Sequence, residues 1–131
     1  MEDAVFDVHG SLESRHWWFK GRHEIVKTVV RRIVRDKPDM EIADIGCGTG
    51  GTVGLLADEF PCWGVDSSER AITIARRTHA GCRFELGAAA EIVAQASERI
   101  GLLLLMDVLE HIEDDGAFLG ALIERIRPGT D

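Results

Sequence analysis

The sequence lacks the features that mark several large classes of protein. No apolar run reaches the roughly 18–20 residues that a membrane-spanning helix needs. The first residues are acidic and contain no apolar core of a signal peptide, so no secretory signal is predicted. No internal repeat or low-complexity stretch is present. What remains is a chain of 131 residues, 45% of them apolar, which is enough for one domain with a modest core.

Cysteine and positive charge are also scarce. The three cysteines, Cys47, Cys62 and Cys82, lack the spacing of a metal site and predict free thiols in a reducing cytoplasm. The 15 basic residues are outnumbered by 23 acidic ones, and the net charge of −8 argues against a nucleic-acid partner. One region departs from this balance, because eight basic and two acidic residues occur from Arg15 to Lys37. We interpret it as a solvated helix face, with contact to an anionic membrane or substrate as the alternative.

Glycine, in contrast, is concentrated in one stretch, residues 40–51. A short apolar strand is predicted over 41–45, and Gly46, Gly48 and Gly50 follow it in a turn. Glycines let the backbone turn sharply and approach a ligand closely. A helix predicted from Thr52 directs its free N–H groups toward the turn. The stretch therefore predicts a cofactor-binding turn in an α/β sheet.

Strands and helices alternate along the rest of the chain. After a short helix or arm in the first dozen residues, helices are predicted over 12–35, 52–58, 69–77, 90–96 and 114–126, and strands over 41–45, 62–65, 82–86 and 102–106. The last strand is a continuous apolar run, which is typical of parallel strands buried on both faces. The alternation predicts a parallel sheet with helices on both faces, and ligands bind such sheets at the carboxyl ends of the strands.

An apolar stripe runs along the first predicted helix. Its members recur at spacings of three and four: Trp18, Arg22, Ile25 or Val26, Val29 and Ile33, widened by Val30 and Val34. Arg22 either pairs with a nearby carboxylate or binds an anionic group of the ligand. Pro38 ends the helix. We divide the chain into an N-terminal helical segment, 1–38, and an α/β domain, 39–131.

The glycine turn by itself fits two classes of adenosine cofactor. Gly46, Gly48 and Gly51 match G-x-G-x-x-G, and Asp66 follows the next strand, where a carboxylate accepts hydrogen bonds from a ribose diol. Nicotinamide and adenosyl cofactors both carry such a diol. Asp44 distinguishes them, because a carboxylate two residues before the first glycine suits an ammonium and a sulfonium and repels a pyrophosphate.

A second stretch, Met106–Asp115, follows the last predicted strand. Together with Asp44–Gly50, Gly64–Asp66 and Pro128–Gly129, it makes residues 42–129 resemble the class I S-adenosylmethionine-dependent methyltransferases. Residues 16–22 also resemble the N-terminal helix of bacterial small-molecule members of this group. The resemblance implies a Rossmann-like sheet in the order 3-2-1-4, as an incomplete form of the family's seven-stranded sheet.

The resemblance also implies a cofactor, S-adenosylmethionine, and methyl transfer to a small-molecule acceptor. Glycine-turn backbone groups would meet the amino-acid end of the cofactor, Asp66 its ribose and Ser67 its adenine. The residues assigned to the cofactor are Arg22, Asp44, Gly46, Cys47, Gly48, Gly50, Asp66, Ser67, Ala88, Ala89, Met106 and Asp107. The acidic adenine contact that the family often has after its third strand is missing here. Backbone groups of Ala88 and Ala89, or the Glu91 side chain, would replace it.

A general base helps when the methyl acceptor is a hydroxyl. His111 is the candidate, with Glu110, Glu113 and Asp107 as alternatives. A histidine at this position also fits a packing and hydrogen-bonding role, so both hypotheses stay open.

The sequence stops shortly after Pro128 and Gly129, which in the resembled family precede a fifth strand. We interpret it as the cofactor-binding part of a truncated enzyme. Its fourth strand would form an open apolar edge, which predicts a homo-oligomer or marginal solubility. Two alternatives remain: a non-catalytic module that binds a cofactor or a partner, and half of an NAD-dependent oxidoreductase.

Overall fold

The computed structural model describes residues 17–131. Its elements, in chain order, are the helix α2 (Trp17–Ile33), the 3-10 turn η1 (Val34–Asp36), β1 (Glu41–Ile45), α3 (Gly51–Leu56), β2 (Cys62–Asp66), α4 (Glu69–Thr78), β3 (Arg83–Leu86), α5 (Ala89–Ala96), β4 (Ile100–Leu104), the 3-10 turn η2 (Leu109–His111) and α6 (Asp115–Ile123). The helix or arm predicted in the first dozen residues, and the start of the helix predicted from Leu12, lie outside the described residues. No helix among residues 17–131 is long and apolar enough to span a membrane.

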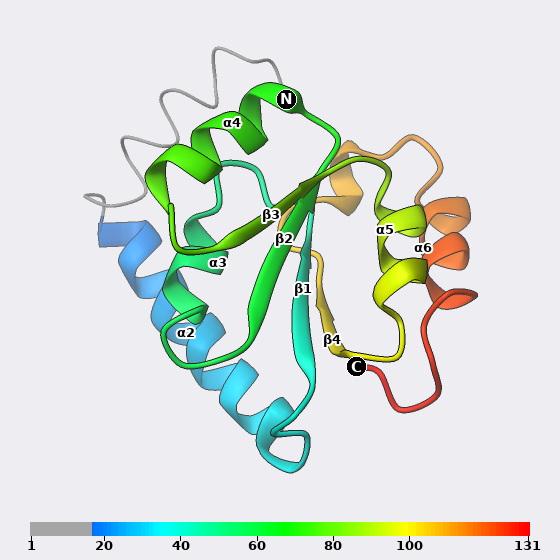
Figure 1. Ribbon diagram of the computed structural model, residues 1–131, viewed down its shortest axis with the longest axis horizontal. Coiled ribbons are helices and arrows are strands. Elements are labelled where there is room, and N and C mark those ends of the chain that lie inside the picture. The colour runs from blue at the N-terminus through cyan, green and yellow to red at the C-terminus, as the bar shows by residue number, and fades with distance from the viewer. Residues whose placement is uncertain (1–16) are drawn as a thin grey trace.

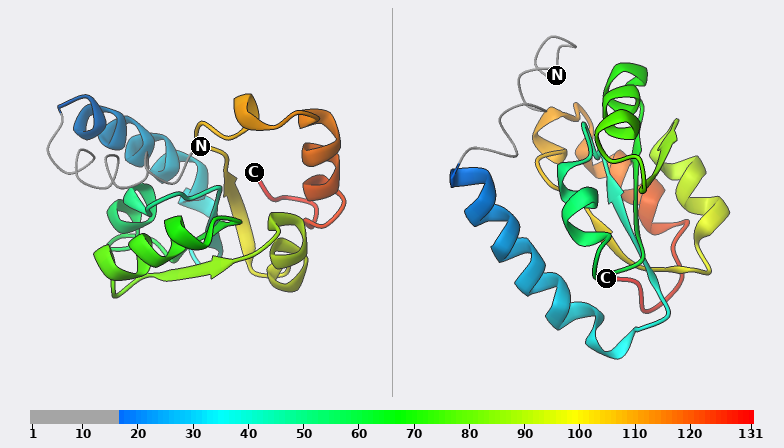
Figure 2. Two further views of the ribbon diagram at one scale, coloured as in Figure 1. Left: turned by 90° about the horizontal axis from the view of Figure 1, so that it is seen from above. Right: turned by 60° about the vertical axis from the view of Figure 1, so that its left-hand side comes forward.

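The four strands form one parallel sheet in the order β3-β2-β1-β4, which confirms the predicted order. Asp44 of the central strand β1 lies beside Gly64 of β2 and Leu104 of β4. Helices α2, α3 and α4 cover one face of the sheet, and α5 and α6 cover the other (Figure 1, Figure 2). All four strands therefore end at the same edge, as the alternating pattern predicted.

Both faces of the sheet are packed. On the side of α5 and α6, the buried residues are Ala43, Ile45, Trp63, Val65, Val93, Ala96, Ile100 and Leu122. On the opposite side, one cluster joins α3, α4 and β3 through Val53, Ile72, Ala75, Phe84 and Cys47. A second cluster joins Val30 of α2 to Ile42, Leu56 and Leu102. The N-terminal helix thus shares a core with the sheet, and the division of the chain at residue 38 stays a prediction.

The buried side of α2 differs from the predicted stripe. Val30 is fully buried, and Val26, Ile33 and Val34 pack beside it. Of the two alternatives Ile25 and Val26, the structure packs Val26 and leaves Ile25 67% exposed, and Val29, which the stripe placed inside, is 48% exposed. The apolar side of α2 is wider than the surface of β1, β4 and α3 against which it packs. Only one half of that apolar side is therefore buried.

The fourth strand begins and ends two residues earlier than predicted, at Ile100 and Leu104. Leu102 and Leu104 pack on the α2 side and Leu103 on the opposite side, so both faces are covered as predicted. Leu103 and Leu104 are nevertheless only half-buried, since β4 is an edge strand with β1 as its only neighbouring strand in the described sheet.

The last helix is shorter than the predicted 114–126. Asp114 caps it, with its Oδ1 accepting a hydrogen bond from the Ala117 N–H at 2.9 Å. Leu122 is buried as predicted, but Ile123 is 63% exposed, because it lies at the last turn and points away from α5 and the sheet. Ser68 caps α4 by accepting from the Ala71 N–H at 3.2 Å.

Candidate functional site

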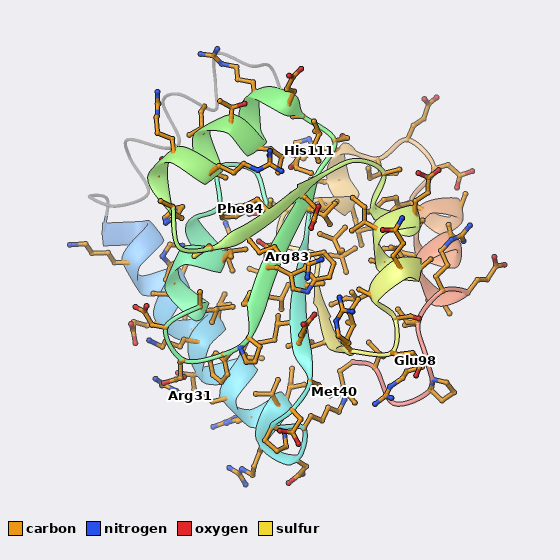
Figure 3. All side chains as sticks on the ribbon, viewed as in Figure 1. Arg31, Met40, Arg83, Phe84, Glu98 and His111 are labelled. Carbon is orange, nitrogen blue, oxygen red and sulfur yellow. The ribbon has the colours of Figure 1, made fainter. Side chains whose placement is uncertain are left out.

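A cavity of about 580 Å³ opens at the carboxyl ends of the strands. Its walls come from the turn after β1, the end of β2, the loop after β3, the segment after β4, and α2. Figure 3 shows His111 at this end of the molecule, and Met40, just before β1, at the opposite end. The volume lies within the 300–1,000 Å³ that is usual for small-molecule and cofactor sites, on the order of one nucleoside-sized ligand.

The turn after β1 is shaped by backbone conformations that favour glycine. Gly46 has a φ of 69°, and the N–H groups of Gly46 and Cys47 both donate to the carbonyl of Val65 on β2. A Cβ at Gly46 would lie 2.7 Å from Val108 Cγ2, so the segment after β4 rests directly on the turn. Gly50, with a φ of 85°, faces Phe84 instead and does not line the cavity. Gly50 thus shapes the turn and packs under α4.

Asp66, at the end of β2, uses both carboxylate oxygens to hold backbone. Its Oδ2 accepts from the Gly48 N–H at 2.9 Å, and its Oδ1 accepts from the Ser68 N–H at 2.8 Å. The side chain is only half-buried and lines the cavity, so each oxygen keeps lone pairs directed at a ligand. A carboxylate held in this way is a rigid acceptor for a diol.

Two buried side chains lie at the turn, Asp44 on β1 just before it and Cys47 within it. Asp44 is 3% exposed and Cys47 is 9% exposed, and both line the cavity. Burial raises the pKa of the Cys47 thiol, and the negative charges of Asp44 and Asp66 raise it further. The thiol therefore stays protonated at neutral pH, which excludes Cys47 as a thiolate nucleophile.

An ion pair closes one side of the cavity. The guanidinium of Arg22 on α2 contacts the carboxylate of Asp107, which follows β4. Asp107 has a φ of 56°, the only positive φ of a non-glycine residue among those described. Aspartate is one of the few residues that tolerates this conformation. Of the two hypotheses for Arg22, the structure shows the pairing with a carboxylate.

A protein-family model described as "Methyltransferase domain" matches residues 17–131. The chain belongs to this methyltransferase domain family.

Curated relatives of this methyltransferase domain include ubiquinone biosynthesis O-methyltransferases. That of Sinorhizobium medicae is 37% identical over 99 residues, which cover 69% of this chain and 38% of the relative. That of Thiobacillus denitrificans is 27% identical over 139 aligned positions, which cover 97% of this chain and 60% of the relative. The chain thus spans between 38% and 60% of the length of these two relatives.

Solved structures with the same fold are also methyltransferases. The S-adenosylmethionine-bound amino pentose methyltransferase CalS10 of Micromonospora echinaspora has a TM-score of 0.72 and 21% identity, over 96% of this chain and 53% of that one. A putative S-adenosylmethionine-dependent methyltransferase of Methanococcus maripaludis has a TM-score of 0.78 and 16% identity, over 95% and 58%. At these identities the likeness shows the fold.

The cavity of the methyltransferase domain gathers residues that are distant in sequence. Of the thirteen positions assigned from the sequence, all but Gly50 line it. Ser67, Ala88 and His111 are exposed at its rim. Glu91, the possible replacement for the adenine contact, is exposed and does not line the cavity. The same holds for Glu110 and Glu113, the alternatives to His111 as the base.

Sequence reasoning did not assign about half of the lining. The additional residues are His23, Ile45, Thr49, Thr52, Val65, Ser68, Gly87, Ala90, Val108, Ile112 and Phe118. Most are sequence neighbours of assigned positions, which is a signal that could have found them. Phe118 lies in the last helix, where the apolar pattern predicts a core position, and only the placement of α6 beside the post-β4 segment brings it to the cavity.

Proposed function

We propose that this chain binds S-adenosylmethionine in the cavity and serves methyl transfer to a small-molecule acceptor. The charge of the lining supports this proposal. The lining contains three carboxylates, those of Asp44, Asp66 and Asp107, and one arginine, Arg22. A lining with surplus negative charge favours a ligand that carries a sulfonium and an ammonium, and it disfavours the pyrophosphate of a dinucleotide.

In this proposal, different lining residues contact different parts of the ligand. Asp66 accepts hydrogen bonds from the ribose hydroxyls, Ser67 lies against the adenine, and the backbone of Ala88 and Ala89 meets the adenine edge. The glycine turn, with Asp44 beneath it, and the Met106 carbonyl hold the amino-acid end. When bound, S-adenosylmethionine supplies a methyl group already activated by its sulfonium. The protein then has chiefly to align the acceptor and exclude water.

We propose His111 as the base that removes a proton from a hydroxyl acceptor. It lines the cavity and is exposed, so an acceptor can reach it. Figure 3 shows His111 at the end of the molecule opposite Met40. Replacing it as His111→Gln is expected to lower the methyl-transfer rate about 100-fold or more, the scale of general-base catalysis, while leaving cofactor affinity unchanged. An unchanged rate assigns His111 to packing.

Calorimetric titration tests the proposed function directly. Wild-type protein is titrated in separate experiments with S-adenosylmethionine, S-adenosylhomocysteine and NAD. Binding of both adenosyl ligands without NAD is the expected result, because only they match the charge of the cavity. Binding of NAD alone would reject the proposal. The non-catalytic module is favoured if the protein binds the cofactor but transfers no methyl group to any acceptor. The same result is then required of a longer chain that has the length of the relatives.

The proposal also covers the cellular location of the protein and its partners. We place it in the cytoplasm, a location supported by its three free thiols. We also propose that copies associate through the outer edge of β4 and that no nucleic acid takes part.

A further inference from the structure

A second cavity, of about 330 Å³, lies at the amino ends of β1 and β2. Its walls come from the end of α2 with η1, the turn before β1, β1 itself and the segment between α3 and β2. Figure 3 shows Arg31 and Met40 at this end of the molecule and His111 at the other. None of the described residues lines both cavities. The second cavity is therefore separate from the one proposed for the cofactor, and its volume suits a small ligand.

One wall of this cavity is apolar and continuous with the core. Ile42 on β1 is 1% exposed, and the side chains of Val34 and Phe60 pack against the core cluster to which it belongs. The apolar lining consists of Val34, Pro38, Met40, Ile42, Phe60 and Pro61. An apolar group of a ligand that covers this wall removes apolar surface from water, which favours binding.

The remaining lining is charged and keeps one positive charge in excess. Arg31 donates through Nε and Nη2 to both carboxylate oxygens of Glu59, at 2.7 and 2.8 Å, so these two charges balance. The Lys37 ammonium contacts the Asp131 carboxylate. Arg35 lines the cavity and is exposed, and within residues 17–131 its guanidinium has neither an ion pair nor a hydrogen bond. The cavity thus carries a free cation on a chain whose net charge is −8.

A single free guanidinium beside an apolar wall matches a ligand with one negative charge and an apolar body. A carboxylate accepts two parallel N–H donors from a guanidinium. A phosphate dianion is a poorer match, because it needs more than one positive charge and leaves the apolar wall in water. We propose that this cavity binds a small monocarboxylate with an apolar ring or chain. Arg35 holds the carboxylate, and the wall around Phe60 holds the apolar part.

This site gives a role to part of the basic segment that the sequence shows between Arg15 and Lys37. The cations at the end of α2 and in η1 then serve an anionic small molecule. The site does not depend on the function proposed above, because it shares no residue with the first cavity.

The test is an NMR titration of the ¹⁵N-labelled chain with 3-phenylpropionate, for which millimolar affinity or better is expected from its size. Saturable shifts are expected at the backbone amides of Arg35 and Phe60, with those of Gly46 and Gly48 unchanged. Two further ligands separate the charge from the apolar body. 3-Phenylpropionamide has the same body without the charge and should bind about fivefold more weakly or worse. Acetate has the charge without the body and should give no saturable shift.

The variant Arg35→Gln tests the proposed anchor. It should lower affinity for 3-phenylpropionate about fivefold or more and leave the weak binding of the amide unchanged. Arg32→Gln is the matched control, because Arg32 is exposed on the same helix but does not line the cavity. It should change affinity for 3-phenylpropionate less than about twofold. Equal free energies of unfolding for the two variants, measured in urea, show that a loss of binding is not a loss of fold.

Four outcomes would overturn the inference. They are the absence of a saturable shift with 3-phenylpropionate, shifts centred on the glycine turn, equal affinities for the acid and its amide, and equal losses in Arg35→Gln and Arg32→Gln. The last result would mean that the acid responds only to the overall charge of the helix. None of these measurements uses an adenosyl ligand, so failure of this site and failure of the proposed function are distinguishable.

Discussion

The carboxylate of Asp66 both holds the backbone of the glycine turn and lines the cavity. Its oxygens hold the Gly48 and Ser68 N–H groups, which fixes the glycine turn against the start of α4. The same oxygens line the cavity, where we propose that they accept the ribose hydroxyls. Fixing the acceptor before the ligand arrives lowers the ordering cost of binding.

Asp66→Ala is expected to lower affinity for S-adenosylhomocysteine at least tenfold, about 1.4 kcal/mol, because charge-assisted hydrogen bonds to the ribose are lost. It should also lower the free energy of unfolding by about 1–3 kcal/mol, since two backbone donors lose their acceptor. Calorimetry and urea unfolding measure the two effects. Asp58→Ala, at an exposed position outside the cavity, is the control. Unchanged affinity in folded Asp66→Ala contradicts the ribose assignment.

Two thiols, the buried Cys47 and the partly buried Cys62, make the free energy of unfolding decrease at alkaline pH. Burial raises the pKa of Cys47 and of Cys62, and the nearby charge of Asp44 raises both further. Above pH 8.5, roughly the pKa of an unperturbed thiol, the unfolded chain loses these protons while the folded chain keeps them. The free energy of unfolding is therefore intact below that pH and falls as pH rises, by about 1.4 kcal/mol per pH unit for each thiol.

Urea unfolding of wild type and of the double variant Cys47→Ala/Cys62→Ala between pH 7 and 10.5 measures this dependence. The decline above pH 9 should be shallower in the double variant, and the difference at pH 7 corrects for lost packing. The chain contains no tyrosine, so no phenol titrates in this range. Parallel pH profiles for the two proteins would show that the thiols do not titrate differently on folding.

At the scale of elements, α2 joins the fold and the site. Val30 packs it against β1, β4 and α3, and eight residues earlier Arg22 faces the cavity. Residues eight apart differ by about 80° around the axis of an α-helix and by about 12 Å along it, so the two side chains lie within one half of the helix surface. One side of the helix thus provides core contacts at its C-terminal half and a ligand contact toward its N-terminus.

Two adjacent valines on α2 provide a matched test of this packing. Val30→Ala should lower the free energy of unfolding by about 2 kcal/mol, because it leaves a cavity in the cluster of Ile42, Leu56 and Leu102. Val29→Ala, at a 48% exposed position, should change it by no more than about 0.5 kcal/mol. Urea unfolding measures both. Equal effects would mean that the helix packs through the stripe predicted from the sequence.

For the whole molecule, β3 and β4 form the two outer edges of the described sheet, and β4 is the apolar one. The backbone of Asp131 already pairs with part of it: its N–H donates to the Gly101 carbonyl at 3.0 Å, and its carbonyl accepts from the Leu103 N–H at 2.8 Å. Figure 1 shows this end of the chain beside β4. The Lys37 ammonium also contacts the Asp131 carboxylate, which ties the end of the α2 region to the same place.

Self-association through this edge is expected for the isolated chain, because the contacts of Asp131 cover only part of it and the half-buried leucines of β4 favour pairing with another copy. Sedimentation equilibrium over a range of protein concentrations should give a molecular mass above the 14.4 kDa of one chain. A monomer at every concentration, with one sharp unfolding transition, would contradict this prediction.

The sequence by itself determined the parallel direction of the strands, the glycine turn and about half of the cavity lining, and the family resemblance implied the strand order. These features depend on local chemistry: alternating apolar segments, glycine conformations, and the shared edge at which parallel strands end. The positions of Asp44, Asp66 and Asp107 relative to the strands follow from the same pattern.

Only the tertiary structure decided which half of the α2 arc is buried, how far β4 extends and where Ile123 and Phe118 lie. Periodicity shows that a helix has an apolar side, but the neighbouring surface selects the part of that side that packs. The pairing of Arg22 with Asp107 likewise depends on the docking angle of α2, which is set by contacts between residues distant in sequence. The sequence alone allowed Arg22 either to pair with a carboxylate or to bind the ligand. The fold places the carboxylate of Asp107 in contact with Arg22 at the cavity.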